Sequence, residues 1–273
     1  MGDRAGLALL ARRLAIIAVL IVALAPVVWL FSIAYKPTSD IFASPPQLLF
    51  SPTWDNFQSV FRYFNLWALL KSSLVIAIGS TILSLILGVP AGYALARATS
   101  PRAIWLAYFF LIIRTVPPIA TLIPFYLFMR DIGLLGTWWA VIMLNTALNS
   151  AFVVWMMFSF FRAAPASIEE AALTDGCTDF GAFVSVALPT VAPGLIASAI
   201  FCVMFSWNDF LYAMFLTKAD TKTISVALLS AYGTKDISWG TLGALAHFST
   251  LPIVLMMILL NRYFVQGLTQ GVH

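Results

Sequence analysis

Residues 72–96 read SSLVIAIGSTILSLILGVPAGYALA and contain no Asp, Glu, Lys or Arg. These 25 residues exceed the roughly 20 apolar residues that a helix needs to cross the hydrocarbon core of a bilayer. Inside lipid every backbone polar group needs an internal partner, which leaves α-helices and closed β-barrels as spanning structures. An uninterrupted run of this length is too long for a barrel strand, so it predicts a transmembrane helix.

Similar uncharged runs follow along the chain, at 14–35, 132–161, 180–208 and 237–261, with one more at 103–129 that only Arg114 interrupts. The sequence therefore predicts an all-α integral membrane protein with six transmembrane helices. Their expected ranges are 13–34, 70–97, 103–129, 137–162, 190–217 and 241–265. The first run could instead be a secretory signal, because Ala23-Leu24-Ala25 resembles a cleavage site. Its apolar stretch is longer than the 7–15 residues usual in signals, which favours a retained helix.

The composition excludes several classes of protein. Of the 273 residues, 62% are hydrophobic and 10% charged. Soluble domains have about 45–50% apolar and about 25% charged residues, so the composition argues against a soluble enzyme. The net charge is +4, but the basic residues are scattered and form no stripe, so nucleic acid is not an expected partner.

Six spans place both termini on one side of the membrane. Arg4, Arg12 and Arg13 precede the first uncharged run and favour a cytoplasmic side for the termini. Residues 36–69 are then an extracytoplasmic loop with an extended segment and a short helix, and residues 163–189 are a cytoplasmic loop. We expect residues 1–273 to form a single transmembrane domain.

The second long loop carries the most specific pattern, PASIEEAALTDGCTDFGAFVSVALP at 165–189. Ser167 and Glu170 have the spacing of a capping box at a helix start. Gly176 can take the left-handed conformation that ends a helix, and Asp179 can cap a second one. The pattern predicts a helix–turn–helix along the membrane surface. It would expose four acidic side chains, those of Glu169, Glu170, Asp175 and Asp179.

The spacing of Glu170-Ala171-Ala172, Gly176, Val186 and Leu188-Pro189 resembles the EAA loop of ABC importer permeases. The family has Ile or another aliphatic residue where this chain has Val186. Further stretches resemble the six-helix permeases of carbohydrate importers of the maltose and glycerol-phosphate type. They include Pro117-Pro118 and Ser206-Trp207-Asn208-Asp209-Phe210, and the resemblance covers essentially the whole chain.

The resemblance implies a permease subunit of an ATP-driven ABC importer for a sugar, sugar derivative or polyol, in the bacterial inner membrane. The chain itself is then no enzyme and holds no cofactor, because ATP and Mg belong to a separate ATPase. The absence of a G-x-x-x-x-G-K-[ST] motif agrees with this. The implied partners are a second permease subunit, an ATPase dimer, an extracytoplasmic substrate-binding protein and membrane lipid. The implied ATPase-coupling residues are Glu169, Glu170, Ala171, Ala172, Asp175, Gly176, Leu188 and Pro189.

Polar residues within the spans are candidates for the solute pathway, because such residues usually face a cavity or a partner. Arg114 lies near the middle of the third expected span and slightly favours an anionic sugar derivative; the alternative is a structural pair with a carboxylate or helix carbonyls. The other candidates are Asn145, Asn149, Asn208, Asp209 and His247, for each of which a structural hydrogen bond is the alternative. No metal site is expected, and Cys177 and Cys202 are expected to be free thiols.

Three other functions stay open at this point. An ABC permease for a non-carbohydrate solute would share the 163–189 loop. A secondary transporter working alone would show inverted repeats, and none is visible in the sequence. A structural membrane scaffold would not need the acidic loop.

Overall fold

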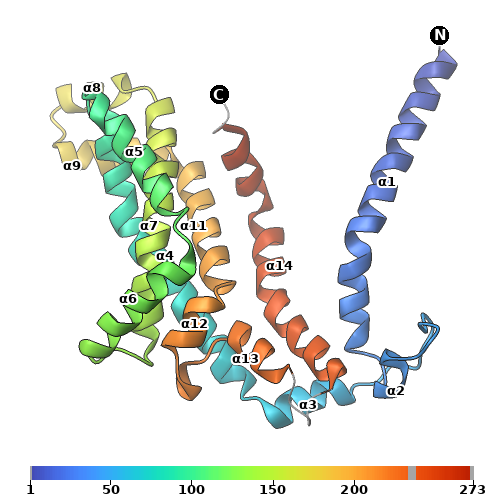
Figure 1. Cartoon of the computed structure of the whole chain (residues 1–273). Coiled ribbons are helices and arrows are strands. Elements are labelled where there is room, and N and C mark those ends of the chain that lie inside the picture. The colour runs from blue at the N-terminus through green and yellow to red at the C-terminus, as the bar shows by residue number, and fades with distance from the viewer. Residues whose placement is uncertain (1, 233–237, 271–273) are drawn as a thin grey trace. The chain divides into compact units, whose positions relative to one another are not determined.

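The computed structural model describes residues 2–232 and 238–270, and these residues form helices joined by short loops (Figure 1). The elements are α1 Gly2–Ile33, α2 Thr38–Ile41, α3 Asp55–Tyr63, α4 Leu66–Arg97, α5 Pro101–Ile113, α6 Pro118–Asp131, α7 Trp138–Ala163, α8 Ser167–Thr174, α9 Asp179–Ala182, the π-helix η1 Phe183–Ala187, α10 Leu188–Thr190, α11 Ala192–Trp207, α12 Leu211–Leu216, the 3-10 helix η2 Ala219–Thr221, α13 Ile224–Ala231 and α14 Trp239–Gln270. The predicted all-α fold is confirmed.

Among the described residues, four helices are long and apolar enough to cross a membrane as single pieces. They are Leu9–Ile33 within α1, α4, α7 and Trp239–Ile258 within α14. Two bent pairs also qualify, namely α5 with α6 and the α9–α10 segment with α11, with bends of 87° and 78°. The predicted six spans are reached when each bent pair counts as one.

The third span is bent because its middle contains Pro117 and Pro118. A proline lacks the backbone N–H of the helix ladder and disfavours helical geometry in the residue before it. The helix α5 therefore ends at Ile113, with Arg114 as its C-cap, and α6 begins at Pro118. The prediction of one continuous helix over 103–129 is wrong, and Arg114 lies at the break instead of inside a helix.

The fifth span is shorter than predicted. The expected helix over 190–217 ends at Trp207, and α12 is a separate short helix. Asp209 lies between the two helices, and its Oδ1 accepts the N–H of Tyr212 in the first turn of α12 at 3.1 Å.

The chain divides into two compact units. The first comprises residues 1–66 and 228–251, and the second comprises residues 67–227 and 252–273. In the first unit, the predicted short helix of the 36–69 loop is present as α3. Its buried Asn56 donates to the carbonyls of Ala34 and Lys36, both at 2.9 Å, and so joins α3 to the end of α1.

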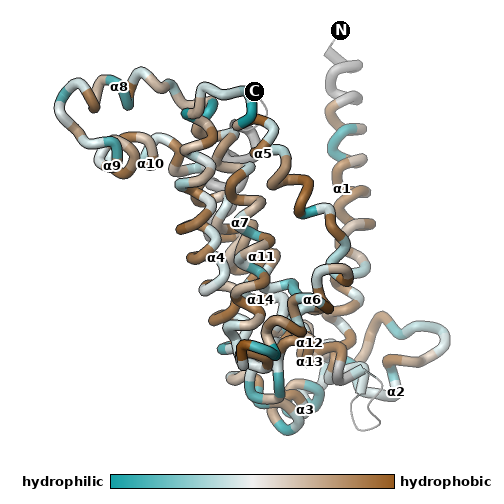
Figure 2. Tube along the Cα trace, turned by 60° about the vertical axis from the view of Figure 1, so that its left-hand side comes forward, coloured by the Kyte–Doolittle hydropathy of each residue, from teal (hydrophilic) through white to brown (hydrophobic). Residues whose placement is uncertain are grey.

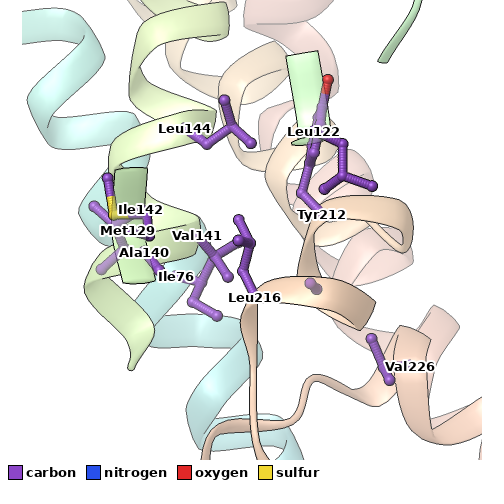
Figure 3. Close-up of a cluster of buried hydrophobic side chains, with 11 residues drawn as sticks. Ile76, Leu122, Met129, Ala140, Val141, Ile142, Leu144, Tyr212, Leu216 and Val226 are labelled. Atoms are coloured by element: carbon purple, nitrogen blue, oxygen red, sulfur yellow. The ribbon is translucent and has the colours of Figure 1, made fainter. Parts of the chain in front are cut away.

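The core of the second unit gathers on α7, against which α5 and α11 pack. Figure 3 shows one buried cluster, which brings together Ile76 of α4, Met129 of α6, Leu216 of α12 and Val141 of α7. Close packing of such side chains supplies many weak attractive contacts, and these matter in lipid because helix association gains little from the hydrophobic effect there. The core therefore holds α4, α6, α7 and α12 as one scaffold.

Candidate functional site

The 163–189 loop forms the predicted helix–turn–helix. The first helix is α8, and Gly176 follows it with φ +92°, the left-handed conformation expected for its position. The second part runs through α9, η1 and α10 to Thr190. Figure 2 shows hydrophilic residues on α8 and α9, in contrast to the mainly hydrophobic α7 and α11.

The caps of these two helices differ from the prediction. The first helix begins at Ser167 with Ala166 as its N-cap and without a side-chain cap, so the Ser167–Glu170 capping box is not formed. The second helix is capped by Thr178, whose hydroxyl accepts the N–H of Gly181 at 3.1 Å, and not by Asp179. Asp179 is the first residue inside the helix, where its negative charge still interacts favourably with the helix dipole.

Glu169 does not belong to the exposed acidic set. Its side chain is buried, with 6% of the residue exposed, and it pairs with Arg97 at the end of α4. The two carboxylate oxygens accept from Arg97 Nη2 at 2.5 Å and Nε at 3.0 Å, and Tyr93 Oη donates to Oε2 at 3.0 Å. The prediction that Glu169 is exposed on the loop surface is wrong, because α8 turns this side chain toward α4.

Arg97 also binds the backbone at the end of α7. Its Nη1 donates to the Phe161 carbonyl at 2.7 Å and its Nη2 to the Ala164 carbonyl at 3.4 Å. A bidentate arginine–carboxylate pair fixes orientation as well as distance. We refer to Tyr93, Arg97 and Glu169 as the α8 anchor, because together they fasten α8 to α4 and α7.

The anchor predicts a definite pH dependence. The hydrogen bond from Arg97 lowers the pKa of Glu169 below its ordinary value, against the opposing effect of burial. A carboxylate with a lowered folded-state pKa stabilises the fold above its unfolded pKa of about 4.3, and this stabilisation is lost as pH falls through the lower, folded value. We therefore expect proteolysis of the 163–189 loop to be constant from about pH 8 to about pH 5. Glu169→Gln should be cut faster throughout that range, and a wild-type rate that rises between pH 7 and 5 would contradict the assignment.

The remaining face of the loop is exposed. Glu170, Asp175 and Asp179 are exposed as predicted, and so are Ala171, Gly176 and Pro189, whereas Ala172 and Leu188 are half-buried. Large apolar side chains accompany the acidic ones: Ile168, Leu173 and Phe180 are 48%, 41% and 74% exposed. A surface that combines apolar and charged residues in this way is typical of a protein interface.

Four of the predicted pathway residues line one pocket of about 230 Å³ in the second unit. They are Arg114, Asn145, Asn149 and Asp209, and we call this the Arg114 pocket. Asn145 and Asn149 belong to one face of α7, Arg114 to the α5–α6 break and Asp209 to the α11–α12 break. The two helix breaks therefore bring the charged side chains to the buried asparagines.

Hydrogen bonds hold the asparagine side of the pocket. Asn145 Nδ2 donates to Asp209 Oδ2 at 3.3 Å, and Asn149 Nδ2 donates to Ser206 Oγ at 2.9 Å. Ser206 in turn accepts from Ser80 of α4 at 2.8 Å. Both asparagines thus have the interhelical bonds expected as their structural alternative, while they also line the pocket.

Arg114 stacks on aromatic rings. Its guanidinium carbon lies 3.8 Å from the Phe205 ring centroid and 5.0 Å from that of Phe152. Within the described residues, no carboxylate forms an ion pair with Arg114, and no acceptor meets its buried Nη1. The alternative of a structural pair with a carboxylate is therefore not realised in this part of the chain.

Two predicted pathway residues lie outside the pocket. Asn208 is exposed, and its Nδ2 donates to the Met204 carbonyl of its own helix at 2.9 Å. His247 belongs to the first unit, where its Nδ1 lies 2.8 Å from the Gly243 carbonyl and its ring packs edge-on against Phe31. Both arrangements are the structural alternatives that the sequence left open.

The sequence did not single out several residues of these two sites. They are Arg97, Tyr93, Phe205 and Tyr212, which lie within or at the ends of the expected spans. The signal available for the anchor is an arginine at the end of one span and the doubled Glu169-Glu170 in the 163–189 loop. Among the described residues no group of His, Cys, Asp and Glu could hold a metal ion, and Cys177 and Cys202 are free thiols.

Comparison with known proteins identifies the family. Residues 84–270 match the family model of the binding-protein-dependent transport system inner membrane component. The chain is 34% identical to the trehalose transport system permease protein SugB of Mycobacterium tuberculosis, over 91% of this chain and 92% of the relative. It is 33% identical to the probable ABC transporter permease protein y4oR of Sinorhizobium fredii, over 90% of this chain and 88% of the relative.

A solved structure agrees in fold. A bacterial ABC transporter involved in the import of the acidic polysaccharide alginate contains a chain that aligns with a TM-score of 0.76 and 23% identity, over 97% of this chain and 98% of that one. The family model covers more than half of the sequence and includes both the 163–189 loop and the Arg114 pocket. The chain therefore belongs to the binding-protein-dependent transport system inner membrane components, the permease subunits of ABC importers.

Proposed function

We propose that this permease moves a sugar, a sugar derivative or a polyol across the bacterial inner membrane. The similarity to the trehalose permease of Mycobacterium tuberculosis, along almost the full length of both chains, is the observation that carries this proposal. Diacetylchitobiose and sulfoquinovosyl glycerol permeases are further relatives, at 29% identity. The polar Arg114 pocket supports it, because solute sites have a few placed polar groups in an otherwise apolar wall.

The proposed assembly contains two permease subunits, an ATPase dimer and an extracytoplasmic substrate-binding protein. Both termini and the 163–189 loop would face the cytoplasm, with the 36–69 loop on the opposite side. ATP and Mg would bind to the ATPase, and this chain would act as a single permease domain. Closure of the ATPases would move the docked loops and rock the helices between inward- and outward-facing states, which is a rigid-body switch.

In this proposal the exposed face of the 163–189 loop contacts the ATPase. Glu170 would make a charged contact, Ala171 and Ala172 would fill a cleft without clashing, and Gly176 would permit close approach. Asp175, Leu188 and Pro189 would complete the contact, and buried Glu169 would hold the loop in place from behind. Exposed Ile168, Leu173 and Phe180 add apolar area to the same face.

Gentle purification of the chain from native membranes, followed by mass spectrometry, tests the assembly. Recovery of an ATPase and a second permease is expected, and uptake of radiolabelled trehalose and diacetylchitobiose by cells tests the solute class. Recovery of the chain alone, in a detergent that preserves other ABC complexes, would contradict the proposed assembly. An intact complex that imports only non-carbohydrate solutes would contradict the sugar assignment alone.

Reversing the charge of Glu170 is expected to weaken the ATPase contact. Removing one partner of an interfacial charge pair costs about 2–5 kcal/mol, so Glu170→Lys should lower ATPase recovery and uptake by at least roughly tenfold. Asp131→Lys is the matched control, because Asp131 is exposed at the end of α6 and pairs with Arg130 on the surface. Equal uptake by the Glu170→Lys protein and the wild type, at equal membrane levels, would exclude this role for Glu170.

A further inference from the structure

The Arg114 pocket contains a positive and a negative charge that do not neutralise each other directly. Arg114 and Asp209 both line it, yet within the described residues they form no ion pair. Both residues are half-buried, with Arg114 over the Phe205 and Phe152 rings, and charged side chains within spans usually face a ligand, a cavity or a pathway. The pocket is therefore lined by two opposite charges that do not contact each other.

Each charge has hydrogen-bonding capacity left for a ligand. Arg114 Nη1 is a buried donor that meets no acceptor among the described residues. Asp209 accepts from Asn145 Nδ2 and from the backbone N–H groups of Tyr212 and Ala213, and a carboxylate has about four acceptor sites. The pocket thus offers an unused donor on Arg114 and remaining acceptor capacity on Asp209.

This combination selects among solutes by charge. An anion would gain from Arg114 but would be repelled by Asp209, and a cation would meet the reverse situation. A hydroxyl group is at once a donor and an acceptor, so a ring with several hydroxyls can satisfy both residues without bringing in a charge. Considered alone, Arg114 favours an anionic solute, but Asp209 in the same pocket removes that preference.

The size of the pocket limits what it can hold. Its volume of about 230 Å³ is below the roughly 300–1,000 Å³ of pockets that enclose drug-sized ligands. One sugar ring is a suitable occupant, whereas a whole oligosaccharide is too large.

We propose that the Arg114 pocket binds one uncharged, hydroxyl-bearing ring of the transported solute, with Arg114 donating to ring hydroxyls and Asp209 accepting from them. Asp209 then discriminates against acidic sugars. This proposal rests on the proposed function, because it assigns a solute subsite to a sugar permease.

Direct binding to the purified permease complex in lipid nanodiscs tests the proposal. Saturation-transfer difference NMR suits weak ligands, and the probes are glucose, glucuronate, glucosamine and serine, each at the same concentration. The first three share one ring and differ in charge, and serine tests the zwitterion that two opposite charges could also accept. The variants are Arg114→Gln and Asp209→Asn. Their matched controls are Arg130→Gln and Asp131→Asn, which make the same changes in an exposed pair.

We expect a signal from glucose in the wild type and in both controls, and none from the other three probes. A hydrogen bond to a charged group implies about a tenfold or larger loss of glucose affinity in Arg114→Gln and in Asp209→Asn. Asp209→Asn should in addition gain a glucuronate signal. Glucose binding that is unchanged in both pocket variants would overturn the proposal, and so would a preference for glucuronate or serine or the absence of binding by any probe.

The uptake and binding experiments together distinguish a wrong subsite from a wrong function. If the complex imports trehalose or diacetylchitobiose but the pocket variants bind glucose like the wild type, only the subsite is wrong. If the intact complex imports no carbohydrate at all, the proposed function is wrong.

Discussion

Replacing Gly92 by leucine is expected to destabilise the folded permease strongly. A Cβ at Gly92 would lie 2.9 Å from the Val154 carbonyl oxygen and 3.0 Å from the Phe158 backbone nitrogen, both in α7. Backbone atoms of a packed helix cannot turn aside as a flexible side chain can. One turn earlier, Gly88 approaches Val153 in the same way, with 2.7 Å to its Cβ.

The two glycines form the Gly-x-x-x-Gly pattern that lets helix backbones approach closely in lipid. Overpacking costs about 1–3 kcal/mol, and more where the backbone must move, so the ratio of folded to unfolded protein should fall roughly ten- to hundredfold. Fluorescence-detected size-exclusion chromatography of detergent extracts, with thermal challenge, measures this loss.

Ala94→Leu is the control for Gly92→Leu. Ala94 belongs to the same helix but is exposed, so leucine there should leave the folded yield unchanged. If Gly92→Leu and Ala94→Leu give the same yield and thermal stability, the close approach of α4 and α7 at Gly92 is not needed for folding.

The second large effect is expected from Arg97→Glu. This change places a second carboxylate beside buried Glu169 and removes the donors to the Phe161 and Ala164 carbonyls. Leaving one partner of a buried pair uncompensated costs about 3–5 kcal/mol. Because α8 would lose its attachment to α4 and α7, we expect ATP-driven uptake to fall at least roughly 100-fold.

Two further variants test whether the loss of uptake comes from the loss of the α8 anchor or from general misfolding. Arg102→Glu makes the same charge change at an exposed position in the first turn of α5 and should retain uptake. The double variant Arg97→Glu with Glu169→Arg reverses the pair and should restore a substantial part of the uptake, although Arg97's two carbonyl contacts stay lost. Uptake of the single Arg97→Glu variant that equals the wild type, at equal membrane levels, would show that the anchor does not contribute to coupling.

Much of the 163–189 loop could be predicted because it depends on neighbouring residues. Gly176 ends α8 in the left-handed conformation, as expected for a glycine after a short helix. The choice between Ser167 and Ala166, or between Thr178 and Asp179, as a cap could not be predicted. Adjacent residues with similar capping ability differ little in free energy, and packing of the whole loop decides between them.

The burial of Glu169 could not be predicted from the local sequence pattern. Consecutive residues of a helix point about 100° apart, so the sequence shows that Glu169 and Glu170 face different ways. It does not show which of them faces the protein. That depends on Arg97, which is 72 residues away in the chain and reaches α8 only after α4 and α7 have packed.

By itself the sequence determined the all-α membrane fold, the approximate spans, the family and the helix–turn–helix of the 163–189 loop. Long apolar runs can exist in lipid only as structures whose backbone hydrogen bonds are all internal. Turn residues determine the conformation of their immediate neighbours. Only the tertiary structure decided that Arg114 and Asp209 line one pocket and that Arg97 buries Glu169. Those contacts depend on where two helices break and how α4, α7 and α11 pack, and residues far apart in the chain set both.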